Sequence, residues 1–148
     1  MLTLVGYKET REAREFFNKL SNLLGVSCKI LFGTKEVEED ENIESFITFG
    51  KAARNRVKNN NLPILELEAA SKIIKADNTE KLRIWNEIEV FVGTYISMSG
   101  KKLSLSSDTL DATFGDKSDV SWSELEMLIA ICDLLGIEKG NLELIKEG

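Results

Sequence analysis

The sequence contains no histidine, only one proline and only two cysteines in 148 residues. Without histidine, the chain cannot form Ser-His-Asp or Cys-His catalytic groups, a histidine general base or a histidine metal site. An enzyme would have to use carboxylates, lysine or tyrosine instead. Outside the main acidic run, the clustered carboxylates are Asp108, Asp111, Asp116 and Asp119. Because loop aspartates of this kind usually cap helices or close turns, we expect no enzymatic activity and no cofactor.

Long hydrophobic runs are also missing. No apolar run approaches the roughly 20 residues that a membrane-spanning helix requires, and Met1 to Tyr7 lacks the basic start and apolar stretch of a signal peptide. Cys28 and Cys132 each lie among aliphatic residues, where a free thiol behaves as a small buried hydrophobe. These absences predict a cytoplasmic protein without a membrane partner or a disulfide.

The net charge is −6 and the isoelectric point is about 4.9. The average electrostatic field of the molecule therefore does not attract nucleic acid, although the net charge does not exclude a local basic patch. Six acids fall between residues 36 and 44, namely Glu36, Glu38, Glu39, Asp40, Glu41 and Glu44. Their order lacks the alternating acids and central glycine of a calcium loop. We interpret residues 36–42 as an acidic linker and expect no metal site.

Two segments show the apolar spacing of amphipathic helices. From Lys8 to Leu24 the apolar residues recur every three or four positions, and Gly25 follows as a left-handed cap. The segment Ser121 to Leu135 repeats this design and ends at Gly136. Both segments are therefore predicted to be helices that end at a glycine.

The centre of the chain is harder to assign. Ile64 to Ala76 has helical spacing, and Thr79 is placed to cap a short helix from Glu80 to Glu87. Beyond it, residues 88–105 are ambiguous, because their β-branched residues alternate but also fit a loop followed by a helix. We keep both alternatives open for this region.

Two stretches, FGKAARNRVKNNNLPILEL (Phe49 to Leu67) and LSLSSDTL (Leu103 to Leu110), lead to a family resemblance. In the first, Gly50, Arg54 and Leu62 fall at the spacings of the first two helices of the lambda-repressor-like helix-turn-helix family. Together the stretches resemble that family over Phe49 to Asp116. The resemblance implies a recognition helix from Thr79 to Asn86.

The expected fold is therefore mainly α, a small helical bundle with a helix-turn-helix-like centre. The alternative is an α+β fold with a hairpin around residues 88–107. The chain is interpreted as a single domain over residues 1–148. It would comprise an N-terminal helical segment (1–35), the acidic linker (36–42), a helix-turn-helix-like core (43–116) and a C-terminal helix and tail (117–148).

Two functions follow as expectations. The resemblance implies a non-enzymatic DNA-binding transcription regulator, with half-site recognition favouring a homodimer. Base edges would be contacted by Asn78, Lys81 and Arg83, and phosphates by Lys51, Arg54, Arg56 and Lys58. The alternative is a small acidic protein–protein interaction module, of inhibitor or immunity type, that uses its acidic run against a basic partner and does not bind DNA.

Overall fold

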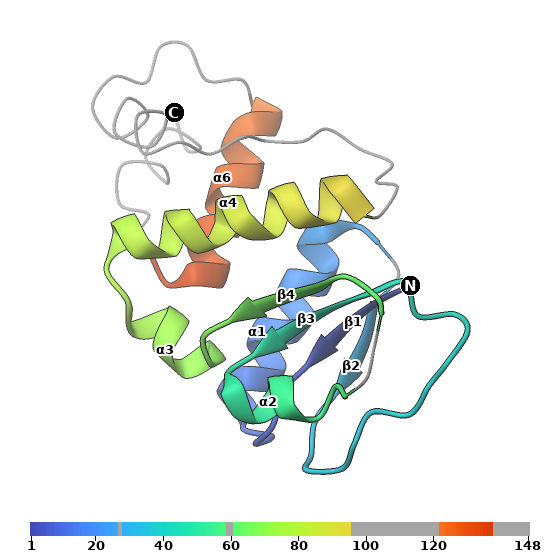
Figure 1. Ribbon diagram of the computed structural model, residues 1–148. Coiled ribbons are helices and arrows are strands. Elements are labelled where there is room, and N and C mark those ends of the chain that lie inside the picture. Colours follow the sequence, from blue (N-terminus) through green and yellow to red (C-terminus); the bar gives the residue numbers. More distant parts are fainter. Residues whose placement is uncertain (27, 59–60, 96–121, 138–148) are drawn as a thin grey trace.

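The computed structural model describes residues 1–26, 28–58, 61–95 and 122–137. Strands and helices largely alternate through the first half of the chain, although two strands, Cys28–Leu31 and Ser45–Phe49, follow each other with no helix between them (Figure 1). The elements in order are β1 (Leu2–Val5), α1 (Arg11–Leu24), β2 (Cys28–Leu31), β3 (Ser45–Phe49), α2 (Lys51–Asn55), β4 (Ile64–Leu67), α3 (Ala70–Lys75), α4 (Asn78–Tyr95) and α6 (Trp122–Leu135). This alternation is typical of an α/β fold with a parallel sheet.

The four strands form one sheet in the order β2-β1-β3-β4, and every pair is parallel. All residues of β1 and β3 are buried. Helices cover both faces of such a sheet, so its central strands are continuous apolar runs rather than alternating patterns. β1 (LTLV) and β3 (SFITF) are buried on both faces in this way, although Thr3, Ser45 and Thr48 interrupt their apolar runs.

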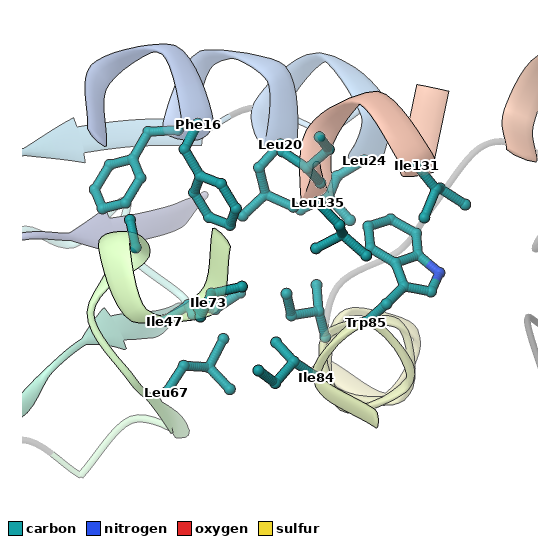
Figure 2. Close-up of a cluster of buried hydrophobic side chains, with 14 of the residues drawn as sticks. Phe16, Leu20, Leu24, Ile47, Leu67, Ile73, Ile84, Trp85, Ile131 and Leu135 are labelled. Carbon is teal, nitrogen blue, oxygen red and sulfur yellow. The ribbon is translucent and has the colours of Figure 1, made fainter. Parts of the chain in front are cut away.

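The two faces of the sheet differ in size. The larger core lies on the face covered by α1, α3, α4 and α6, and Figure 2 shows Phe16, Leu20, Ile73, Trp85 and Leu135 converging there. The smaller core lies under α2, where Ala53 and Val57 pack against Val5 and Phe46. Figure 1 shows α2 in front of the sheet and α1 behind it.

The expected fold, a mainly α helical bundle with a helix-turn-helix-like centre, is wrong. Phe49 ends a strand, and Ile64 to Leu67, which the resemblance assigned to the second helix, is strand β4. The expected recognition helix, Thr79 to Asn86, is part of the continuous 18-residue helix α4. An all-α description fails because four short apolar runs pair with one another across the chain, and local spacing does not reveal such pairing.

The alternative α+β fold with a hairpin also differs from the structure. Residues 88–95 belong to α4, while residues 96–107 lie outside the described residues. The predicted helix Ile64 to Ala76 is wrong in its first half and correct from Ala70 to Lys75.

The two terminal helices are confirmed. α1 ends at Gly25 with φ 64°, and the backbone after α6 reaches φ 71° at Gly136. The Ile137 amide then bonds back to the Cys132 carbonyl at 2.8 Å, which closes the end of α6. Within the described ranges, no helix is long and apolar enough to cross a membrane.

Candidate functional site

A cavity of about 1000 Å³ lies at the carboxyl ends of the strands. From β1 the chain turns through α1 to β2 on one side, whereas from β3 it turns through α2 to β4 on the other. The connections therefore diverge between β1 and β3. In open parallel sheets this is where ligands characteristically bind. The cavity includes Gly6 and Tyr7 after β1, and Gly50 and Lys51 after β3.

The turn after β1 is packed too closely to accept a side chain at Gly6. A Cβ atom there would lie 2.8 Å from the ring of Phe32. The Gly6 amide donates to the Leu31 carbonyl at 2.8 Å, and Gly33 donates to the Tyr7 carbonyl at 2.9 Å. The first turn of α1 follows, where the Thr10 hydroxyl accepts a hydrogen bond from the Ala13 amide at 3.1 Å.

The turn after β3 also depends on glycine. Gly50 has φ 97°, a region that residues with a Cβ rarely adopt, and its amide donates to the Leu67 carbonyl at 2.7 Å. α2 begins at the next residue, and no side chain caps it. The first amides of a helix have no partner within the helix. Lys51 and Ala52, at the start of α2, line the cavity.

Aromatic rings form the apolar part of the cavity. Phe17 stacks on Phe32 with ring centroids 4.9 Å apart and lies 4.6 Å from Phe49. The Arg14 guanidinium lies 5.9 Å from the centroid of Phe32. The site thus combines an apolar floor with a polar rim, the usual composition of a ligand pocket.

Most charged side chains on the rim are already paired. The cavity is lined by five basic and four acidic side chains: Lys8, Lys51, Arg54, Lys72 and Arg83, with Glu12, Glu66, Glu68 and Glu87. Arg54 pairs with Glu66 at 2.5 Å, Lys72 with Glu68 at 3.7 Å, and Arg83 with Glu87 at 2.8 Å. Lys8 and Lys51 are exposed and form no ion pair with any described residue.

The residues predicted to contact base edges do not share one exposed face. Asn78 is exposed at the start of α4. Lys81 is only 5% exposed, and its ammonium lies 3.4 Å from the Gly136 carbonyl at the end of α6. Arg83 is held by Glu80 and Glu87, and its hydrogen bonds to Glu80 are the main cause of a raised Arg83 pKa. The same contact lowers the pKa of Glu80.

The residues predicted to contact phosphates are also divided. Lys51 lines the cavity and Lys58 is exposed outside it. Arg54 lines the cavity but is bound to Glu66, while Arg56 is buried beneath the strand ends. Of this predicted set, Lys51 lines the cavity and forms no ion pair within the described ranges of the chain.

The acidic run lies between β2 and β3. In it, Asp40 pairs with Lys29 at 3.7 Å and accepts a hydrogen bond from the Asn42 amide at 2.9 Å. Among the residues that the structure describes, no group of three or more potential ligands is arranged to hold a metal ion.

The sequence-based prediction missed Gly6, Tyr7, Lys8 and Thr10. A signal for them exists: LTLVG and SFITFG are each an apolar run that ends in glycine shortly before a helix. Strand, glycine and helix in this order are typical of a ligand-binding turn in a parallel sheet. The same pattern occurs twice, and the structure places the two turns side by side.

The fold and the cavity define a parallel α/β domain with a candidate binding site between β1 and β3. No protein-family model matches the chain, and neither a curated protein nor a solved structure matches it.

Proposed function

We propose that this protein is a non-enzymatic binding module that holds an anionic group of a partner protein in the cavity between β1 and β3. The observation that carries the proposal is a pair of exposed lysines, Lys8 and Lys51, beside the two glycine turns. Neither forms an ion pair with a residue that the structure describes. Their ammonium groups would contact a phosphate or carboxylate of the partner.

The charge distribution supports an anionic ligand at this place in an otherwise acidic molecule. The whole chain carries a net charge of −6, whereas basic side chains outnumber acidic ones in the cavity lining. Three of the four lining carboxylates are neutralised by Arg54, Lys72 and Arg83. An incoming anion therefore meets the field of Lys8 and Lys51 with little opposition from those acids.

A protein partner fits these features better than DNA. Recognition of a duplex requires several cations along one face, and affinity depends on the number of phosphates they neutralise. Arg56 and Lys81 are buried, and Arg54 and Arg83 are bound to carboxylates. The apolar floor suits side chains next to the anionic group of a partner. The proposal includes a cytoplasmic location, which suits the free thiol of Cys28.

The proposal can be tested with inorganic phosphate as a minimal probe. Phosphate added at constant ionic strength should shift the backbone amide signals of Gly6, Tyr7, Lys51 and Ala52 in a two-dimensional NMR spectrum. Lys51→Ala should weaken this binding by about tenfold, the value of one charge-assisted hydrogen bond.

Lys58→Ala is the matched control. It removes the same charge from an exposed lysine beyond the other end of α2, outside the cavity. Binding should change by less than about twofold, because a surface charge at that distance is screened. The proposal fails if phosphate shifts none of the amides at the two turns, or if the two variants weaken binding equally.

A further inference from the structure

Arg56 is a buried arginine, 8% exposed, that pairs with no described carboxylate. Its guanidinium instead donates to three backbone carbonyls: Gly6 at 2.6 Å, Leu31 at 3.2 Å and Lys35 at 2.8 Å. Burial lowers its pKa, with no opposing contribution from a neighbouring acid. A cation in such a position is costly unless its hydrogen bonds compensate for lost hydration.

These carbonyls belong to the segments that form the candidate site. Gly6 follows β1, Leu31 ends β2 and Lys35 lies in the loop after β2. The backbone of Arg56 adds a further link, since its carbonyl accepts from the Val37 amide at 2.8 Å. One residue thus joins the carboxyl ends of two neighbouring strands to the loop that follows them.

The carboxyl end of a parallel strand exposes carbonyl oxygens, which carry partial negative charge. At Gly6, which lines the cavity, this charge would oppose an anion bound there. The Leu31 carbonyl is part of the same strand end and already accepts the Gly6 amide. The guanidinium of Arg56 neutralises both oxygens, and it fixes the direction of the Gly6 carbonyl. The lysines of the two turns then face an anion in the cavity without competition from the Gly6 carbonyl.

We infer that Arg56 is the positioning residue of the anion site. Its guanidinium holds the turn after β1 in its binding conformation and cancels the strand-end carbonyls, without itself touching the ligand. The ligand in this inference comes from the proposed function. The claim that Arg56 holds the conformation of the turn does not depend on any ligand. Arg56 therefore acts through Gly6 and Tyr7 rather than as a DNA-phosphate contact.

Arg56→Lys is the informative variant, because it keeps the positive charge while one ammonium cannot span three carbonyls. Amide hydrogen exchange should accelerate by about tenfold at Gly6 and Gly33, whose amides bond across this turn. The dissociation constant for inorganic phosphate should rise by about tenfold, corresponding to one lost charge-assisted contact. Arg56→Gln, which also removes the charge, should weaken phosphate binding further.

The matched control is Val57→Ala, at the next residue, which is 2% exposed in the core under α2. It lowers stability through lost packing but does not contact the strand-end carbonyls. The exchange rate of the Gly6 amide, compared with that of the amides in the sheet, should therefore change by less than about twofold, and so should the affinity for phosphate. If Arg56→Lys has no larger effect than Val57→Ala on exchange at Gly6 and Gly33, the inference is overturned. If wild-type protein does not bind phosphate but the exchange effect is present, the proposed function fails while the positioning role holds.

Discussion

The role of a single basic residue depends on whether its side chain is exposed. Lys51 and Arg83 both line the cavity, but Arg83 is bound to carboxylates. Arg56 and Lys81 are buried. Their charge predicted DNA contact, but accessibility depends on tertiary packing that no local pattern encodes. The sequence could therefore nominate Lys51 without distinguishing it from the others.

Lys81 offers a test at this scale. Its stem packs in the core beside α6, and its ammonium reaches the Gly136 carbonyl. Lys81→Met should change the free energy of unfolding by less than about 1.5 kcal/mol, since it keeps the volume and removes a buried charge. Lys81→Ala should cost about 1–3 kcal/mol through lost packing. Urea denaturation measures both, and equal stabilities of the two variants would contradict a packing role for the stem.

At the scale of elements, helices were predicted better than strands. α1 carries an amphipathic stripe and a glycine cap, and both features are local. The strands β1, β2 and β4 have four residues each. Parallel pairing buries every residue of β1, so β1 shows no alternating burial pattern, and the edge strands β2 and β4 are too short to show one clearly. The run ILEL even continues into a true helix, so its helical spacing was misleading. Strand identity is fixed by partners that lie far away in the sequence.

The start of α4 shows the same limit and can be tested directly. The sequence suggested Thr79 as the cap, but the Asp77 carboxylate accepts the Glu80 amide at 2.8 Å, and α4 begins at Asn78. Asp77→Ala should therefore destabilise the protein by about 0.5–2 kcal/mol. Thr79→Ala, the matched control, should stay within about 0.5 kcal/mol of wild type, because Thr79 is exposed. Chemical denaturation decides, and a larger loss for Thr79→Ala would refute this assignment of the cap.

At the scale of the whole molecule, the site exists because two distant turns meet. Gly6 and Gly50 are far apart in sequence, and only the parallel pairing of β1 with β3 brings their turns to one edge. Each strand–glycine–helix pattern was visible in the sequence, but the strand order that joins them was not. The family resemblance selected lysines and arginines as contact residues, but it placed them in the wrong fold.

From the overall charge of the molecule we predict that the protein does not bind duplex DNA. With a net charge of −6 and its cations dispersed, the protein should show no salt-sensitive retention on duplex DNA. We expect wild type and Arg83→Ala to elute together from immobilised duplexes, even at about 50 mM salt, where phosphate contacts are strongest. Lys51→Ala/Lys58→Ala serves as the control for non-specific attraction by exposed lysines. Retention of wild type with a log–log salt slope of about −3 or steeper would require roughly three or more neutralised phosphates. That result would contradict the preference for a protein partner and restore DNA as the ligand of the site.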